Sequence, residues 1–172
     1  DLMACAQTGS GKTAAFLVPV IHYILKNGVS IPTGRTSLPI AVVMAPTREL
    51  AAQIFDEARK LCFDTEVRAA VVYGGVDYRE QSVHMQFGCD ILVATPGRLK
   101  DLYDRYLVGF SRVRYLILDE ADRMLDLGFE EQIEYLVAGS ETDMPLAGKR
   151  VTMLYSATFP KPIQNLARSY LK

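Results

Sequence analysis

The sequence predicts an α/β fold in which a mostly parallel sheet carries helices on both faces. Six short apolar runs, rich in Val, Ile and Leu, lack strict alternation, which is typical of strands covered on both sides. Segments with apolar residues at helical spacing separate these runs, and such alternation favours a doubly wound architecture. The predicted strands are 2–6, 40–45, 68–73, 90–94, 115–118 and 151–155.

Two helical stripes are clearest, and we expect both to face the core. They consist of Leu50, Ile54, Ala58 and Leu61, and of Ile163, Leu166, Ala167 and Tyr170. Segments 27–38 and 139–148 combine Gly, Pro and hydroxyl residues and are predicted to be surface loops. Without a second core or a repeat, 172 residues indicate one domain over 1–172, and the start inside a predicted strand suggests a fragment.

Composition narrows the functional classes. The formal net charge of −1 excludes a globally basic nucleic-acid binder, so any such contact must come from a local cluster. Cys5, Cys62 and Cys89 lack metal-ligand spacing and are predicted to be reduced, packed thiols of an intracellular protein. No apolar run is long enough to span a bilayer, so no membrane association is expected.

A phosphate-binding pattern follows the first predicted strand. Residues 6–13, AQTGSGKT, fit G-x-x-x-x-G-K-[ST], with Ala6 in place of the first glycine. Glycines let the backbone approach phosphate oxygens, and the N–H groups that begin the next helix point at the anion. Lys12 would supply a charge for the β- and γ-phosphates, and the Thr13 hydroxyl a Mg²⁺ ligand. The alternative is an ordinary glycine turn before a helix.

An acidic pair follows the apolar run at 115–118. Asp119 stands where a Walker B aspartate holds Mg²⁺, and Glu120 can orient and deprotonate an attacking water. Taken alone, the pair could equally stabilise the start of a helix. Its occurrence beside a phosphate loop in one sheet favours the catalytic interpretation.

Two further strand ends resemble each other. The segments at 46–49 and 95–98 each place threonine, proline and arginine at a predicted helix start, which suits phosphate groups. Together with the backbone of Gly74 and Gly75, they could grip successive phosphates of one strand. The alternative at each site is helix capping with an exposed arginine. From the residues alone, Ser156 and Thr158 are best explained as caps before Pro160.

The motifs AQTGSGKT (6–13), PTRELA (46–51), Gly74-Gly75, TPGR (95–98), DEAD (119–122) and SAT (156–158) resemble those of the DEAD-box RNA helicases in order and spacing. The stretches VVMAPTRELAAQI, VVYGGVD, LVATPGRL, LDEADRMLDLGFE and SATFPKPIQNLAR resemble the branch that includes Vasa. The resemblance covers essentially the whole chain. It implies the N-terminal RecA-like lobe, a three-layer sandwich, of an enzyme that couples ATP hydrolysis to local RNA unwinding.

The same resemblance implies roles for individual residues. ATP would be bound by Ala6, Thr8, Gly9, Ser10, Gly11, Lys12 and Thr13, with Mg²⁺ at Thr13 and Asp119 and with Lys12, Asp119 and Glu120 as catalytic residues. The RNA backbone would be contacted by Pro46, Thr47, Arg48, Gly75, Thr95, Pro96, Gly97 and Arg98. Ser156 and Thr158 would bond to Asp122 and couple nucleotide state to RNA binding, which replaces the capping interpretation.

The resemblance also implies parts outside this chain. An adenine-reading Q motif would precede Asp1, and a second RecA-like lobe with arginine fingers would follow Lys172. The expected partners are therefore RNA, bound without sequence preference, and the second lobe, and the isolated lobe would be weakly active or inactive. Vasa-like proteins are chiefly cytoplasmic, so residence in the cytoplasm, including RNA granules, is expected, with the nucleus as the alternative.

Two other functional classes compete with the helicase. A phosphate-loop enzyme of another kind, such as a small-molecule kinase or a DNA translocase, shares the ATP motifs, but a kinase has no use for the two additional helix starts at 46–49 and 95–98. A non-catalytic scaffold has no need for Lys12, Thr13, Asp119 and Glu120 together.

Overall fold

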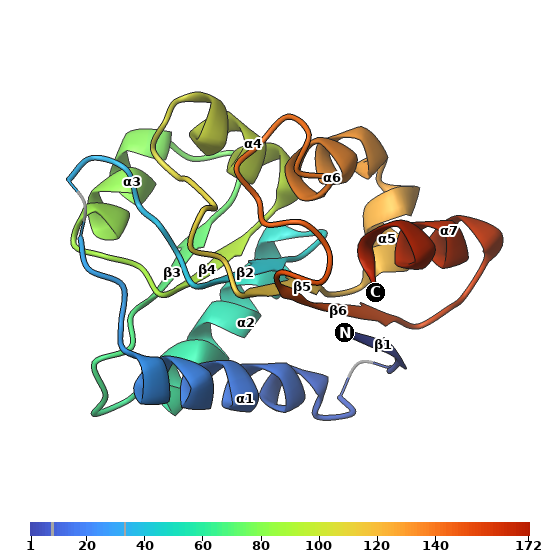
Figure 1. Ribbon diagram of the computed structural model, residues 1–172, viewed down its shortest axis with the longest axis horizontal. Coiled ribbons are helices and arrows are strands. Elements are labelled where there is room, and N and C mark those ends of the chain that lie inside the picture. The colour runs from blue at the N-terminus through green and yellow to red at the C-terminus, as the bar shows by residue number, and fades with distance from the viewer. Residues whose placement is uncertain (8, 33) are drawn as a thin grey trace.

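The sheet has six strands, all parallel, in the order β1-β6-β5-β2-β4-β3 (Figure 1). The computed structural model describes residues 1–7, 9–32 and 34–172. The strands are β1 (Leu2–Cys5), β2 (Ala41–Met44), β3 (Ala69–Val72), β4 (Ile91–Ala94), β5 (Tyr115–Leu118) and β6 (Val151–Ser156). All six predicted strands are confirmed, with ends that differ by one residue at most.

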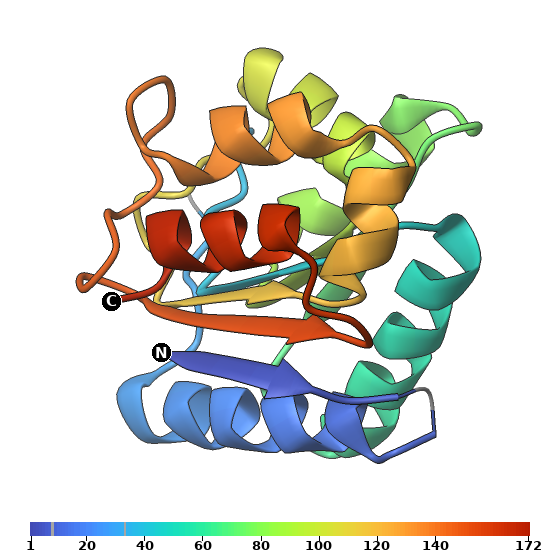
Figure 2. The same ribbon diagram turned by 90° about the vertical axis from the view of Figure 1, so that its right-hand side faces the viewer.

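Helices cover both faces of this sheet, so the predicted three-layer α/β architecture is confirmed (Figures 1 and 2). One face carries α1 (Lys12–Asn27) and α2 (Arg48–Leu61). The other face carries α3 (Tyr78–Gln86), α4 (Pro96–Asp104), α5 (Ala121–Asp126), α6 (Glu130–Val137) and α7 (Lys161–Tyr170). None of the helices in the described ranges combines the length and apolarity needed to cross a membrane.

Strand β2 shows why the apolar runs do not alternate. Ala41 and Val43 pack on the side of α1 and α2, whereas Val42 and Met44 pack on the side of α3 to α7. All four side chains are fully buried because each face of the strand meets a helical layer.

The predicted helical stripes are largely confirmed. The four α7 residues are buried, as are Ile54 and Ala58 of α2, while Leu50 is half-buried. The expectation for Leu61 is wrong, since its side chain is 39% exposed. Leu61 is the last residue of α2, and the last turn of this helix extends beyond the apolar core.

The register of the sheet aligns the carboxyl ends of its strands. Met44 of β2 pairs with Ala94 of β4 and with Leu118 of β5, and Leu118 pairs with Leu154 of β6. The residues that follow these positions therefore emerge at one edge of the sheet, which is where ligands bind in open parallel sheets.

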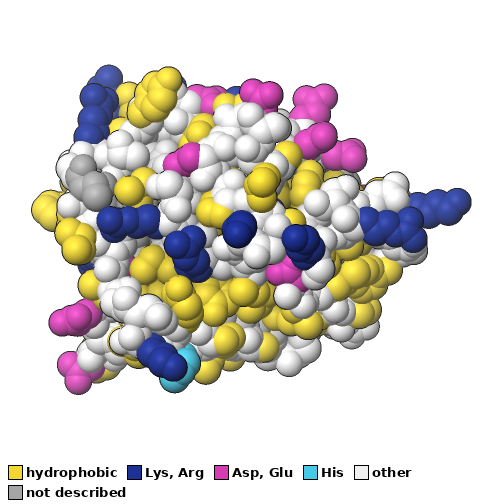
Figure 3. Space-filling model, viewed as in Figure 1, with side chains coloured by type: hydrophobic (Ala, Val, Ile, Leu, Met, Phe, Trp, Pro, Cys, Tyr) yellow, Lys and Arg dark blue, Asp and Glu magenta, His cyan; other side chains and the backbone are white. Residues whose placement is uncertain are grey.

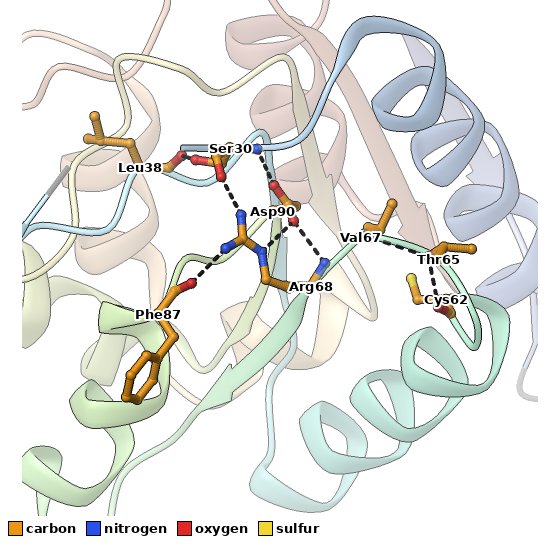
Figure 4. Close-up of polar contacts among 8 residues, drawn as sticks. All are labelled: Ser30, Leu38, Cys62, Thr65, Val67, Arg68, Phe87 and Asp90. Carbon is orange, nitrogen blue, oxygen red and sulfur yellow. Dashed lines mark hydrogen bonds and ion pairs between the residues drawn. The ribbon is translucent and has the colours of Figure 1, made fainter. Parts of the chain in front are cut away.

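At the opposite edge, Asp90 holds four chain segments together (Figure 4). Its buried carboxylate accepts hydrogen bonds from the Ser30 backbone N–H and from the Arg68 backbone N–H (2.8 Å), and it pairs with Arg68 Nε at 3.3 Å. The Arg68 guanidinium also donates to the carbonyl oxygens of Ser30 and Phe87. The loop after α1 is thereby attached to β3, β4 and α3.

The second predicted loop, 139–148, is attached by a buried cation. The Arg150 guanidinium donates to the carbonyl oxygens of Val137 and Pro145 and to the Thr152 hydroxyl. Burial lowers the pKa of Arg150 to about 10, so the side chain still carries its charge at neutral pH. Carbonyl dipoles thus replace the water around this charge.

The three cysteines are free thiols. Cys62 and Cys89 are buried as predicted, but the prediction is wrong for Cys5, which is exposed because β1 is an edge strand. Burial and the nearby Asp90 carboxylate raise the pKa of Cys62 to about 11 and raise the pKa of Cys89 further.

We expect Asp90→Asn to lower the free energy of unfolding by about 2–4 kcal/mol, because it leaves Arg68 and two backbone donors poorly compensated. Urea unfolding at unchanged m-value measures this. Glu57→Gln, which removes an exposed pair with Lys60, is the control and should leave the midpoint nearly unchanged. A loss below about 0.5 kcal/mol for Asp90→Asn would contradict this role.

We also expect a single fast-reacting thiol in the folded 172-residue chain. A disulfide reagent at neutral pH should modify Cys5 rapidly, and modify Cys62 and Cys89 only after denaturation, since both are buried and almost wholly protonated. A Cys5→Ser variant should then show no fast phase. Rapid reaction of two or more thiols in the native protein would rule out this packing.

Candidate functional site

The phosphate-loop segment connects β1 to α1. The Ala6 backbone N–H donates to the Ser156 carbonyl oxygen (3.2 Å), which extends the β1–β6 ladder into the loop. Gly9 and Gly11 both have φ of 82°, a left-handed conformation that L side chains rarely adopt. Ser10 is exposed and its N–H donates to the Gln7 carbonyl oxygen. The predicted contact at Thr8 lies outside the described residues.

The start of α1 suits an anion. Its N-cap is Gly11, which offers no capping side chain, and its first turn contains no acidic residue. The first N–H groups of a helix lack intrahelical partners and carry the positive end of the dipole. Backbone donors at Lys12 and Thr13 are therefore available to phosphate oxygens.

Lys12 joins the loop to the acidic pair. Its buried ammonium lies 2.7 Å from Asp119 Oδ1 and 3.8 Å from Glu120 Oε1. The Asp119 N–H donates to the Met44 carbonyl oxygen, so Asp119 is fixed where β5 ends beside β2. The three predicted catalytic residues thus meet at one point.

The Asp119 carboxylate is fully buried and only half satisfied. Oδ1 accepts from the Glu120 N–H and contacts Lys12, whereas Oδ2 has no hydrogen-bond partner among the described residues. Burial raises the pKa of Asp119, and the Lys12 ammonium partly opposes this.

The unpartnered Asp119 Oδ2, with the Thr13 hydroxyl at the start of α1, fits a Mg²⁺ ion, which prefers few protein oxygens together with phosphates and water. The described residues contain no group of three His, Cys, Asp or Glu side chains that could enclose a metal alone. The oxygen donors therefore fit a metal that arrives with a nucleotide.

Glu120 has a strained backbone, with φ of 52° and ψ of 51° at the N-cap of α5. Non-glycine residues rarely adopt this region, and when they do it is often at functional sites. The conformation directs one carboxylate oxygen toward Lys12 and the other toward Arg123 Nη1 at 3.4 Å.

A cavity of about 330 Å³ lies between these groups. It is lined by Ala6, Lys12, Glu120, Asp122, Arg123, Asp126 and Ala157. It thus brings together the phosphate loop, Glu120 of the acidic pair and the segment that follows β6.

Asp122 and Thr158 form the predicted link between α5 and the end of β6. Asp122 Oδ2 accepts from the Thr158 hydroxyl (2.9 Å) and from the Thr158 backbone N–H (3.0 Å). Partial burial raises the pKa of Asp122, but hydrogen bonds, led by that of the Thr158 hydroxyl, hold it below its usual value. The Ser156 hydroxyl donates to the Thr158 carbonyl oxygen (2.7 Å) and so shapes this turn, and Ser156 also contributes to the lowered pKa of Asp122.

The first predicted RNA element follows β2. Pro46 is buried, and Thr47 is the N-cap of α2, accepting from the Leu50 N–H at 3.2 Å. The exposed Arg48 stacks on the Tyr73 ring, 5.1 Å from its centroid. A Cβ added to Gly75, whose φ is 83°, would meet Arg48 Nη1 at 2.7 Å, so a larger residue here would displace this guanidinium and strain the backbone.

The second element, after β4, is built differently. Thr95 is buried at the N-cap position of α4, but its side chain makes no capping hydrogen bond. Pro96 and Gly97 are the first two residues of the helix. Arg98 is mostly buried, since its side chain is 11% exposed, and it donates to Gln81 Oε1 and the Val76 carbonyl oxygen, both at 2.8 Å. It holds the turn after Gly75 in place.

Sequence reasoning missed three residues of this site. Tyr73 and Gln81 position Arg48 and Arg98, but such contacts between distant elements leave no spacing pattern. Arg123 could have been found, because it lies one helical turn after Glu120.

Charge alone would not have located the site. Figure 3 views the molecule from the edge where the strands begin and shows a row of Lys and Arg side chains across its middle. Apolar side chains gather below this row, and most of the acidic ones lie toward the rim. The carboxyl edge is distinguished by its backbone donors and paired carboxylates.

Comparison with known proteins agrees with this geometry. The sequence profile of the DEAD/DEAH box helicase family matches residues 1–166. The DEAD-box splicing factor Prp28 of yeast is 36% identical with a TM-score of 0.92, and the RNA helicase Prp28 of Chaetomium thermophilum, solved with ADP, is 41% identical with a TM-score of 0.84. A DEAD box protein from the hyperthermophile Methanococcus jannaschii is 35% identical with a TM-score of 0.84.

These matches cover 100%, 100% and 99% of this chain but only 39%, 39% and 43% of those chains, respectively. The chain therefore corresponds to less than half of each of these proteins, and it has the RecA-like α/β fold of that part. Because the family profile spans nearly every residue and the motif side chains meet at one sheet edge, the chain belongs to the DEAD/DEAH box helicase family.

Proposed function

We propose that this chain is the ATP-binding lobe of an ATP-dependent RNA helicase, which unwinds short RNA duplexes when joined to its second lobe. One observation carries the proposal: Lys12, where the phosphate loop joins α1, contacts both Asp119 and Glu120 at the same sheet edge as the two helix starts suited to RNA phosphates. A kinase would need the ATP-binding residues but not the two helix starts. A scaffold would not need the catalytic residues.

The residues divide the chemistry. The phosphates of ATP would compete with the carboxylates for the Lys12 ammonium. When ATP binds, this ammonium would move from Asp119 to the phosphates. Glu120 would accept the proton of the attacking water, and Arg123 and the strained backbone would keep its carboxylate oriented. Thr13 and Asp119 would hold Mg²⁺, which neutralises charge on the phosphates when bound.

RNA would be held through its backbone. Arg48, presented by Tyr73, and the N–H groups at the start of α4 would bind successive phosphates, so that binding would be independent of sequence. The Asp122–Thr158 hydrogen bond joins α5, which follows the catalytic pair, to the segment after β6. Through this bond, the presence of ATP or ADP would be communicated to the second lobe.

Finer assignments extend this proposal. The chain would belong to the branch that includes Vasa, as its motif-flanking stretches suggest, and would act in the cytoplasm, including RNA granules. Comparison of the second lobe with Vasa and with Prp28 tests the branch, and fluorescence imaging of the tagged full-length protein tests the location.

The function itself is tested by ATP hydrolysis in the full-length protein with and without RNA. We expect RNA to raise the rate at least tenfold and DNA of equal length to raise it little. Equal stimulation by DNA would favour a translocase, and a rate unaffected by either nucleic acid would refute the proposal.

Glu120→Gln in the full-length protein should preserve ATP affinity and lower RNA-stimulated turnover by about 10²-fold or more, since the amide cannot accept the proton. Glu131→Gln, at an exposed position of α6, is the control and should behave like the wild type. Turnover near the wild-type rate in Glu120→Gln would refute the role of Glu120.

Gly75→Ala and Gly74→Ala form a matched pair. The first adds a Cβ that collides with Arg48 and strains a left-handed backbone, whereas the second meets nothing within 4 Å. We expect Gly75→Ala to weaken RNA binding about tenfold, measured by fluorescence anisotropy, and Gly74→Ala to have a much smaller effect. Equal losses in the two variants would show that the position of Arg48 is not what binds RNA.

A further inference from the structure

We propose that the free edge of β3 is a docking site for an extended peptide of a partner protein. The peptide would carry apolar side chains at alternate positions, an acidic side chain toward Arg59 and a basic one toward Glu80. Unpaired backbone groups, apolar walls and two opposed charges support this assignment.

The edge offers unused hydrogen-bonding groups. The carbonyl oxygens of Arg68 and Val72 accept from Ile91 and Thr95, both at 3.1 Å, so alternate residues of β3 pair with β4. In a parallel ladder the N–H and C=O of the intervening residues, Ala69 and Val71, point the other way. In the described part of the chain nothing is hydrogen-bonded to these four groups.

A side chain closes one end of the free edge. The Tyr73 N–H donates to Gln81 Oε1 at 3.3 Å, whereas the Arg68 N–H lies on the β4 side and donates to Asp90 Oδ2 at 2.8 Å. The open part is Ala69–Val72, about 13 Å of strand. Its sequence contains no charge or proline, the usual protections of an edge strand against pairing.

The edge forms the floor of a groove of about 710 Å³. Phe55 and Arg59 of α2 form one wall, and Glu80 and Gln81 of α3 with Phe87 form the other. Phe87 is 72% exposed, so a large apolar surface faces the groove without a covering side chain. An added strand would place alternate side chains against these two walls.

The charges of the groove favour a peptide over a nucleic acid. The Arg59 guanidinium lies 5.7 Å from the Phe55 ring centroid and has no ion pair within the described residues, whereas Arg68 is paired with Asp90. Glu80 on the opposite wall would repel a polyanion. An acidic and a basic side chain on one strand would satisfy both walls.

Selection of a displayed library of random peptides, about twelve residues long, on the full-length protein tests the proposal. We expect selected peptides to alternate apolar residues with charges of both signs and to slow amide exchange at Ala69 and Val71 at least tenfold. Arg59→Glu should weaken their binding about tenfold, and a peptide with lysine in place of the acidic residue should restore it. Arg168→Glu, at an exposed position of α7, is the control, and neither variant should change RNA-stimulated ATP hydrolysis.

Three results would overturn the proposal. The first is that selected peptides leave exchange at Ala69 and Val71 unchanged or bind Arg59→Glu as well as the wild type. The second is that oligouridine, tested as the competing ligand, protects these amides instead. The third is that both amides become protected with rising protein concentration alone, with a doubled mass in light scattering, which would show that a second copy of the chain occupies the edge.

Discussion

The constraint on which the molecule depends is the parallel direction and common register of its six strands. Since Met44, Ala94, Leu118 and Leu154 lie level with one another, whatever follows them emerges at one edge. Residues more than 100 positions apart, such as Lys12 and Asp119, therefore meet without a long connection. The two helical layers bury the apolar strands, and the loops at that edge carry the chemistry.

At this edge, charge is concentrated and incompletely satisfied. Asp119 is buried with one oxygen unpartnered, and the Lys12 ammonium serves two carboxylates at once. Such an arrangement costs stability, because burial disfavours the ionised carboxylate. A nucleotide with its metal ion would supply the missing partners, so the groups that lower the stability of the fold are those proposed to bind the ligand.

Much of this could be predicted from the sequence. Unbroken apolar runs located every strand, and the spacing of Gly11, Lys12 and Thr13 located the phosphate loop, because both patterns are local. Strand order is not local, and it decides that β6 separates β1 from β5. For the same reason the support of Arg98 by Gln81 and the exposure of Cys5 on an edge strand were not predictable.

We propose that nucleotide and RNA bind at the same carboxyl edge of the sheet. The most direct measurement maps amide chemical shifts of the ¹⁵N-labelled chain while ADP with Mg²⁺, and then oligouridine, are added. We predict that ADP perturbs the amides from Gly9 to Thr13 and at Asp119 and Glu120, and that RNA perturbs those at Arg48, Gly75 and Gly97. RNA-induced shifts confined to the opposite edge, where Figure 3 shows the row of basic side chains, would contradict the account.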